Sequence, residues 1–300
     1  MSAVTEQPLV SIVTPSFNMG RYIDETILSV LEQDYPNIEY LVMDGGSTDG
    51  TLDILKRYQG RLQYVSEPDR GQTDAINKGF QRTRGSIFTF LNADDTLLPG
   101  AVTTAVAALR ENPDAGVIYG DAWFIDENGA RISAYPVEPF AAEKLARRCF
   151  ICQPAAFMRR EVFASSGMLD PELHFGLDYD LWIRVAQRYS MKKIEGFLAT
   201  SRLHQASKTV NDMDKMFTNT IQILRRYYGY VPYNWLYGYG YHRLTGRSIA
   251  VERPRPSAIS ACFSIALGAR YNWRHPLRYC RDIVSTAREG LMPAKDSLVR

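Results

Sequence analysis

The sequence predicts an α/β fold with a doubly wound, mostly parallel mixed sheet and a helical, basic C-terminal extension. Strand-like apolar runs alternate with helical patterns four times before residue 111, and the connections between them are short. This alternation stops after Gly116, which indicates a differently built second half. A content of 45% hydrophobic and 23% charged residues among 300 excludes a disordered or fibrous protein.

Each strand of the first half is followed by a polar turn and a helix. Strands are expected at 9–14, 38–43, 62–65 and 86–91, and helices at 22–33, from 48 or 49, at 73–83 and at 99–110. The second half predicts a hairpin of 117–125 and 130–135, a helix at 138–148, an extended segment at 153–158, a helix at 180–189 and a linker at 252–257. Because ligands of open α/β sheets bind at the carboxyl edge, the polar turns after strands one, two and four predict a site there.

Composition and cysteine usage favour a cytoplasmic location. No run approaches the roughly 20 apolar residues of a spanning helix, and residues 1–7 do not resemble a signal peptide. Four cysteines make no disulfide framework, which indicates a reducing compartment. Cys149 and Cys152 have zinc-site or redox spacing, but their apolar flanks favour two small buried side chains.

The segment Asn92-Ala93-Asp94-Asp95 follows the fourth strand and is the sharpest chemical signal. Adjacent carboxylates repel each other, and a divalent cation such as Mg²⁺ or Mn²⁺ offsets that repulsion. The alternative is that Asp95 or Thr96 caps the helix expected near Pro99. The position at the end of a parallel strand favours the metal.

Asp44 follows the second strand within a glycine-rich turn, where a carboxylate can bind a nucleobase or ribose. The turn is neither a dinucleotide fingerprint nor a P-loop, which argues against an oxidoreductase and an ATPase, and a simple chain reversal is the alternative. In the next helix, Asp74, Asn77 and Lys78 share one face, and a solvated face is the alternative there.

Two acids precede the helix expected at 180–189. Either Asp178 or Asp180 can cap it, which leaves the other as a candidate general base. His204 follows a further apolar run and is a candidate for contact with a metal or phosphate, although most single histidines have neither role.

Taken together, these segments resemble the family 2 glycosyltransferases, which are inverting enzymes with the GT-A fold. The resemblance covers about residues 9–208. It rests on the order of SIVTPSFN (11–18), VMDGGSTDGT (42–51), EPDRGQTDAINKGF (67–80), LNADD (91–95) and DYDLWIR (178–184).

The resemblance implies roles for individual residues. Pro15 and Phe17 would line the nucleobase pocket, Asp44 would bind the base, and Asp178 would be the catalytic base. The metal ligands would be Asp94, Asp95 and His204, with Asp94 also touching the donor. Further donor-site candidates are Asn18, Asp74, Asn77 and Asn92. Two departures are Asn92, where many members have an aspartate, and Leu177, where many have a glutamate before the base.

The expected activity is that of a metal-dependent hexosyltransferase of polysaccharide or glycan synthesis, with Mn²⁺ or Mg²⁺ as cofactor. A UDP- or dTDP-sugar would be the donor, and a glycan or lipid-linked hydroxyl the acceptor. A non-catalytic nucleotide-sugar-binding module is the alternative, and Asp178 would have no use in it. Residues 1–220 would form the catalytic domain, with the donor half at 1–115 and the acceptor half at 116–220.

Residues 221–300 form a basic, aromatic-rich helical region, with 13 basic and 4 acidic residues. Arg270, Arg274, Arg278 and Arg281 recur at helical spacing beside Trp273 and Leu277, which predicts one basic helical stripe. Such a surface suits the inner face of an anionic membrane. A subdomain that covers the catalytic core or joins two copies is the alternative, and no nucleic-acid-binding motif is present.

Overall fold

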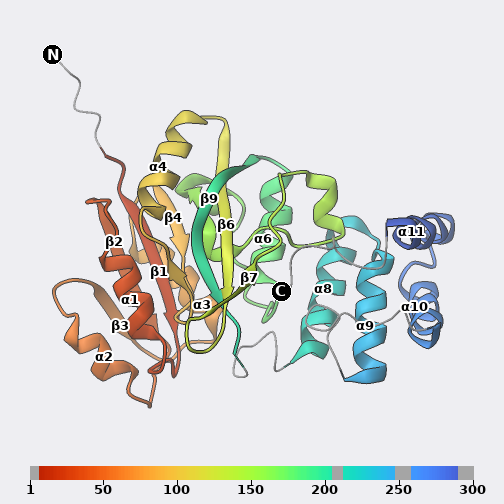
Figure 1. Ribbon diagram of the computed structural model, residues 1–300, viewed down its shortest axis with the longest axis horizontal. Helices are drawn as coiled ribbons and strands as arrows, with labels where there is room; N and C mark the ends of the chain where they lie inside the picture. Colours follow the sequence, from red (N-terminus) through yellow and green to blue (C-terminus); the bar gives the residue numbers. More distant parts are fainter. Residues whose placement is uncertain (1–6, 205–211, 247–257, 290–300) are drawn as a thin grey trace. The chain divides into compact units, whose positions relative to one another are not determined.

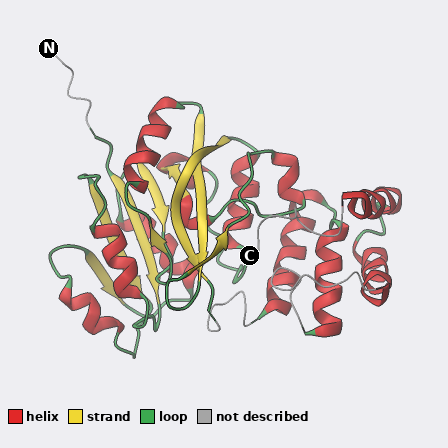
Figure 2. Cartoon of the chain, in the orientation of Figure 1, coloured by secondary structure: helices red, strands yellow, loops and turns green. Residues whose placement is uncertain are grey.

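The computed structural model describes residues 7–204, 212–246 and 258–289 (Figures 1 and 2). The chain divides into two compact units, of which unit 1 comprises residues 1–140 and 150–203, and unit 2 comprises residues 141–149 and 204–300. The boundary expected after residue 220 lies inside helix α8 (Met213–Tyr228), and the linker expected at 252–257 lies outside the described residues.

A mixed sheet forms the centre of unit 1, with strand order β3-β2-β1-β4-β8-β6-β9-β5 and with β7 paired to β6 (Figure 2). Its strands are β1 (Val10–Ser16), β2 (Ile38–Asp44), β3 (Gln63–Ser66), β4 (Ile87–Phe90), β5 (Thr96–Leu97), β6 (Ala115–Ile125), β7 (Arg131–Ala134), β8 (Ala156–Arg159) and β9 (Ser190–Arg202). The first four are mutually parallel, as the sequence predicts, and β9 is parallel to β6. The hairpin of β6 and β7 is confirmed.

Helices cover both faces of this sheet. They are α1 (Ile23–Leu31), α2 (Thr51–Arg57), α3 (Gln72–Arg82), α4 (Ala101–Glu111), α5 (Arg160–Ser165) and α6 (Leu177–Ala186). Apolar side chains of α1, α2 and α4 pack in one core with Ile12 and Val42. On the opposite face, the rings of Phe80, Phe88 and Phe163 have centroids 4.7–5.0 Å apart and join α3 and α5 to β4.

Three local expectations are wrong. Only a 3₁₀ turn, η1 (Ala142–Ala146), forms where a helix was expected at 138–148, because the chain is still extended at Ala141. Helix α4 begins after Gly100, whose left-handed φ of 77° ends the preceding turn, so neither Asp95 nor Thr96 caps it. Helix α6 begins at Leu177 after Gly176, which places both Asp178 and Asp180 within its first turn.

The described part of unit 2 consists of η1 and four helices, α8, α9 (Tyr233–Thr245), α10 (Ala258–Tyr271) and α11 (Pro276–Glu289). The carboxylate of Asp282 on α11 accepts hydrogen bonds from the Tyr230 hydroxyl (3.0 Å) and the Tyr233 amide (2.6 Å) and pairs with Arg147. The single basic stripe predicted for Arg270 to Arg281 is wrong, because α10 ends before Pro276 begins α11. None of the described helices combines the length and apolar character needed to span a bilayer.

Candidate active site

The ends of the parallel strands meet at one edge of the sheet. Parallel register places Ser16 opposite Asp44 and Asp44 opposite Ser66. The Gly45 amide donates to the Ser16 carbonyl (2.8 Å), and the Glu67 amide donates to the Asp44 carbonyl (3.0 Å). The turns after β1, β2 and β3 therefore lie side by side at the edge where the sequence, from the turns after its first, second and fourth strands, predicts the site.

Asp44 is buried at the centre of this edge. Its carboxylate accepts hydrogen bonds from the hydroxyls of Ser47 (2.5 Å) and Ser66 (2.7 Å) and from the amides of Gly46 (3.1 Å) and Ser47 (3.0 Å). These bonds fix the turn after β2 and hold the carboxylate in place. The resemblance implies that the same carboxylate contacts a nucleobase.

The turn after β1 presents Phe17, whose side chain is 57% exposed, next to buried Pro15. Asn18 holds this turn against the turn after β2, since its amide donates to the Ser47 hydroxyl (2.8 Å) and its side-chain oxygen accepts from the Thr48 amide (2.9 Å). Asn18 adopts a left-handed φ of 53°, a conformation that asparagine tolerates better than most residues. An exposed aromatic ring on a fixed turn is available for stacking.

Asp94 and Asp95 follow β4 at the same edge. Asp95 is buried and accepts hydrogen bonds from the Arg202 amide (2.9 Å) and the Asn92 side-chain amide (3.0 Å). Burial, and next the charge of Asp94, raise the pKa of the Asp95 carboxyl well above its ordinary value. The surroundings of Asp95 therefore disfavour the ionised form of its carboxyl, which a bound cation would favour.

Arg202 at the end of β9 holds this acidic segment in place, a role that the sequence analysis missed. In addition to its amide bond to Asp95, its buried guanidinium donates to the Asp94 carbonyl (2.9 Å) and pairs with Glu25 on α1 (2.5 Å). Thr26 on the same helix donates to the Asp95 carbonyl (2.8 Å). The one signal in the sequence for this role of Arg202 was its position two residues before His204.

The donor set of Asp94 and Asp95 fits a hard divalent cation, because two carboxylate groups lie together where burial disfavours their charge. Mg²⁺ typically takes one or two carboxylates and completes its shell with phosphate oxygens and water. No group of three or more His, Cys, Asp or Glu side chains suited to a metal occurs among the described residues. His204, the first residue of the second segment of unit 2, is buried.

Helix α3 links the acidic segment to the loop before α6. At its first turn, the Gln72 side chain donates to the Asn92 side-chain oxygen (2.6 Å), and the Thr73 hydroxyl donates to the Leu173 carbonyl (3.1 Å). One turn later, Asn77 donates to the carbonyl of Leu169 (2.9 Å) and accepts from its amide (3.0 Å). The Asn77 side chain thus holds the loop that leads to Asp178.

Asp74, also on α3, is held by two cations. It pairs with Arg70 (3.0 Å) and with Lys78 (3.0 Å), so the shared helix face of Asp74 and Lys78 is confirmed. Burial acts to raise the pKa of Asp74, but the hydrogen bonds from Arg70 and Lys78 outweigh it and lower that pKa to about 2. Asp74 is therefore ionised at any physiological pH.

Asp178 and Asp180 differ in their surroundings although both lie in the first turn of α6. Asp180 is fully buried and accepts a hydrogen bond from Arg184 Nε (2.8 Å), while Arg184 also binds the Met168 carbonyl (2.6 Å). Asp178 is half-buried, and burial raises the pKa of its carboxyl despite backbone hydrogen bonds. Asp180 is thus part of the scaffold, whereas Asp178 has the properties of a proton acceptor.

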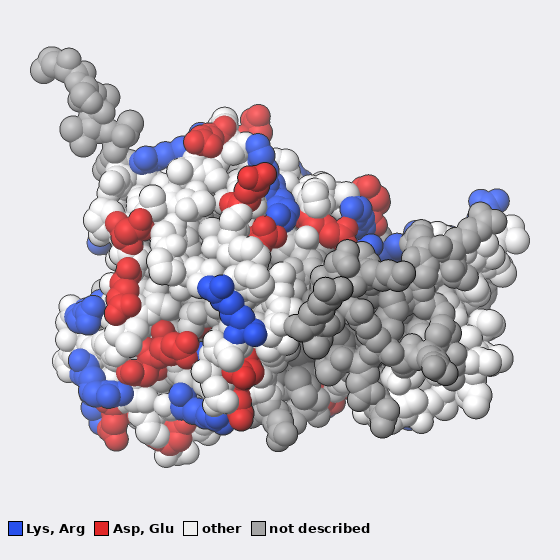
Figure 3. Space-filling view, in the orientation of Figure 1, with Lys and Arg blue, Asp and Glu red and all other residues white. Residues whose placement is uncertain are grey.

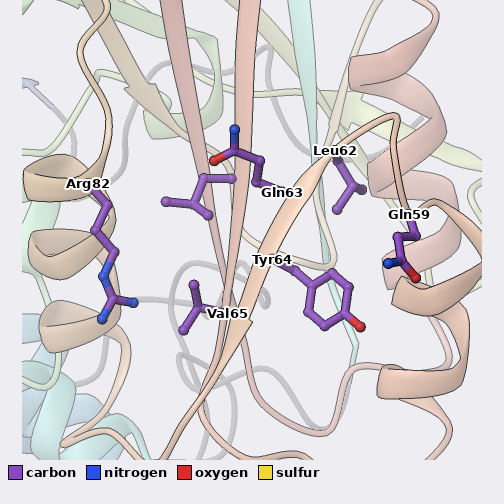
Figure 4. Close-up of a pocket in the computed structure, with 7 residues that line it drawn as sticks. Gln59, Leu62, Gln63, Tyr64, Val65 and Arg82 are labelled. Carbon is purple, nitrogen blue, oxygen red and sulfur yellow. The ribbon is translucent and has the colours of Figure 1, made fainter.

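A hollow of about 560 Å³ lies elsewhere, around the outer edge of β3 (Figure 4). Gln63 and Val65 lie on the side of Arg82, whereas Tyr64 lies on the side of Gln59 (Figure 4). It is lined by Leu41, Gln59, Leu62, Gln63, Tyr64, Val65 and Arg82. This hollow includes none of the predicted site residues and has no carboxylate in its lining.

Comparisons with known proteins find a matching family and related sequences. Residues 11–167 match the model of the family described as glycosyl transferase family 2. An uncharacterised glycosyltransferase of Rickettsia typhi is 30% identical over 227 residues, covering 72% of this chain and 70% of that protein. Chondroitin synthase of Escherichia coli is 26% identical over 221 residues, covering 72% of this chain but only 32% of that enzyme.

Solved structures share the fold at low sequence identity. The S. aureus TarS fragment 1–349 in complex with UDP-GlcNAc has a TM-score of 0.59 and 15% identity, covering 81% of this chain and 74% of that one. A mannosyltransferase of Pyrobaculum calidifontis in complex with GDP-Man and Mn²⁺ has a TM-score of 0.53 and 18% identity, covering 96% of this chain and 78% of that one. The expected GT-A fold is confirmed by these similarities.

Proposed function

Because this chain belongs to glycosyl transferase family 2, we propose that it is a metal-dependent, inverting enzyme that moves a sugar from a nucleotide-sugar donor to an acceptor hydroxyl. Its activity as a glycosyltransferase follows from the family, and relatives such as chondroitin synthase act in polysaccharide synthesis. The observation that carries the finer proposal is the buried Asp95 beside Asp94 at the carboxyl edge of the sheet.

The turns after β1 and β2 would bind the nucleoside. Phe17 offers an exposed ring for the base, with Pro15 beside it, and Asn18 keeps that turn fixed. Asp44 would reach the base through a lone pair that its hydrogen bonds to the turn leave available. Asp74 would act on the donor indirectly, through Arg70, whereas Asn77 would hold the loop that leads to Asp178.

Asp94 and Asp95 would hold the divalent cation, with Asn92 orienting Asp95. The role of His204 as a further ligand stays an expectation from the resemblance, since the described residues form no group of three metal-binding side chains. When bound, such a cation supplies positive charge that stabilises the departing diphosphate. Arg202 keeps the acidic segment in one conformation, so the two carboxylates are already oriented before the donor binds.

Asp178 would act as the general base. Its carboxylate takes the proton of the acceptor hydroxyl as that oxygen forms a bond to the anomeric carbon, while the bond to the diphosphate breaks on the opposite face. The configuration at the anomeric carbon is thereby inverted, and a nucleoside diphosphate is released. The pairing of Asp180 with Arg184 supports Asp178 rather than Asp180 in this role.

We propose a UDP- or dTDP-sugar as the donor, and a glycan or lipid-linked hydroxyl at the inner face of the membrane as the acceptor. The TarS structure contains UDP-GlcNAc, which supports a uridine nucleotide, whereas the mannosyltransferase contains GDP-Man. A non-catalytic nucleotide-sugar-binding module would have no use for the half-buried carboxylate of Asp178, whose pKa is raised by burial.

The test is a panel of UDP-, dTDP- and GDP-sugars with Mn²⁺, measured for release of nucleoside diphosphate and for transfer. Asp178→Asn should abolish transfer while leaving the dissociation constant of the donor nearly unchanged, because the substitution keeps shape and removes only the proton acceptor. Glu172→Gln, an exposed change in the same loop, serves as the control. Loss of donor binding in Asp178→Asn would place Asp178 in the donor pocket and overturn its role as base.

A further inference from the structure

Helix α10 is inverted relative to an ordinary amphipathic helix. Its small residues Ser260, Ser264 and Gly268 are buried, although two of them are polar. Three of its large apolar residues are exposed instead, with Ile259 at 71%, Ile265 at 46% and Phe263 at 37%. Helices of soluble proteins normally turn such residues toward the core.

The inversion has a packing cause inside unit 2. A Cβ atom on Gly268 would lie 2.0 Å from the ring of Tyr279, and one on Gly240 of α9 would lie 2.9 Å from the Ser264 hydroxyl oxygen. The Tyr279 hydroxyl also donates to the Ser264 carbonyl (2.8 Å). Because α9 and α11 approach this closely, only small residues fit on the inner face of α10, and the large ones lie outside.

The apolar surface continues beyond α10. Trp273, between the two helices, is 67% exposed, and Leu277 and Val284 on α11 are 76% and 51% exposed. We call the exposed side chains of residues 258–286 the α10–α11 surface. Six large apolar side chains exposed within one stretch of about 25 residues favour a site of interaction with a membrane or another protein.

Every exposed charge on the α10–α11 surface is positive. Its exposed arginines are Arg270, Arg274, Arg278 and Arg281. Asp282 is the only acid among residues 258–286, and it is buried against Tyr230, Tyr233 and Arg147. In the view of Figure 3, the described part of this surface, at the right, is white and blue.

We propose that the α10–α11 surface docks on an anionic phospholipid membrane. Apolar side chains reach the acyl boundary from such a surface while arginines meet lipid phosphates, and tryptophan favours the interface between the two. Arg274 lies over the ring of Trp273, 4.9 Å from its centroid, which joins the two kinds of contact at one point. A second copy of the chain is a poorer occupant, because a symmetric pairing would oppose arginines to arginines with no exposed acid to meet them.

This surface belongs to unit 2, whereas the proposed donor and base residues belong to unit 1. Docking can therefore be tested without donor or acceptor, and its failure would leave the proposed transfer reaction intact. If both hold, the surface would deliver the enzyme to the plane in which lipid-linked acceptors lie.

The experiment is flotation of the full chain with vesicles of phosphatidylglycerol and phosphatidylcholine in equal parts, compared with phosphatidylcholine alone. We expect binding to the anionic vesicles that weakens steeply with salt, because the electrostatic attraction is screened. Leu277→Ser should weaken this binding about tenfold, since the side chain would lose its place in the acyl boundary. Arg274→Gln should weaken it about fivefold through the loss of one charge near the lipid surface.

Matched controls come from positions outside the surface. Leu244 on α9 is also exposed, so Leu244→Ser makes the same chemical change elsewhere in unit 2, and Arg61→Gln removes an exposed arginine of unit 1. Both should bind vesicles as the unmodified chain does. Equal binding by Leu277→Ser and Leu244→Ser, or no binding to anionic vesicles, would overturn the proposal. A dimer in solution that Leu277→Ser dissociates would also overturn it and assign the surface to a second copy.

Discussion

The turn after β2 and the acidic segment after β4 lie at the same edge of the sheet, but they treat their carboxylates in opposite ways. Asp44 accepts four hydrogen bonds from Gly46, Ser47 and Ser66, so its charge is used to fix the turn. Asp95 accepts two, and burial beside Asp94 raises its pKa. The two carboxylates therefore differ in how many of their acceptor positions the protein's own donors fill: most at Asp44, and fewer at Asp95.

The largest effect should come from removing charge at the acidic segment. We expect Asp95→Asn to lower kcat/KM by roughly 10²–10³-fold, which is the range for loss of one electrostatic contact to the transition state. The free energy of unfolding should not fall, because the substitution removes a buried charge. Steady-state kinetics with Mn²⁺ and urea unfolding measure the two quantities, and a large loss of stability would mean that Asp95 is a scaffold residue like Asp44.

At Asp44 the balance should be reversed. Asp44→Asn turns one of the two accepting oxygens into an NH₂ group, which cannot accept a hydrogen bond from the Ser47 or Ser66 hydroxyl that it faces, and this should cost about 2 kcal/mol of unfolding free energy. Asp53→Asn, at an exposed pair with Lys56, is the control and should leave stability unchanged. If Asp44→Asn unfolds at the same urea concentration as the unmodified chain, the hydrogen bonds around Asp44 do not stabilise the turn.

A smaller effect should appear at Asn77, which holds the loop before Asp178. Asn77→Ala removes both hydrogen bonds to Leu169 and should lower kcat about tenfold through misplacement of the base, without changing donor affinity. Asn77→Asp keeps the acceptor for the Leu169 amide and should recover part of kcat. A matching loss of donor affinity would instead return Asn77 to the donor site.

The smallest expected effect is a shift of the acid limb of the kcat/KM–pH profile to higher pH. Asp178 must be ionised to accept a proton, and burial raises its pKa above the ordinary 3.8. As the pH falls, kcat/KM should therefore decline at a higher pH than it would with an unperturbed aspartate. Measurement of kcat/KM against pH, with circular dichroism to follow the fold, tests this. An acid limb at the ordinary value would show that Asp178 is not the proton acceptor.

Local patterns predicted much of unit 1 from sequence. The four strand–helix repeats and the hairpin were found because apolar periodicity and turn residues are local signals. The break between α10 and α11 was missed although Pro276 marks it, since a residue before proline avoids the helical conformation. The prediction used the spacing of the arginines alone and therefore continued one helix through Pro276.

The site was predicted less fully, for a different reason. The acids at strand ends could be found because they lie beside apolar runs, but their partners are distant in the chain. The Arg202 amide reaches Asp95 across 107 residues, and Asn77 reaches Leu169 across 92. No local pattern encodes such contacts, so the sequence showed which groups carry charge and not which neighbours hold them.

The anchoring of the acidic segment by Arg202 has a consequence for turnover. Its amide and guanidinium bind Asp95 and the Asp94 carbonyl, and its pairing with Glu25 ties the segment to α1. A segment fixed in this way need not be rebuilt in each catalytic cycle, which keeps the reorganisation energy of the reaction small. The motion that admits substrate and releases product then has to come from other parts of the chain.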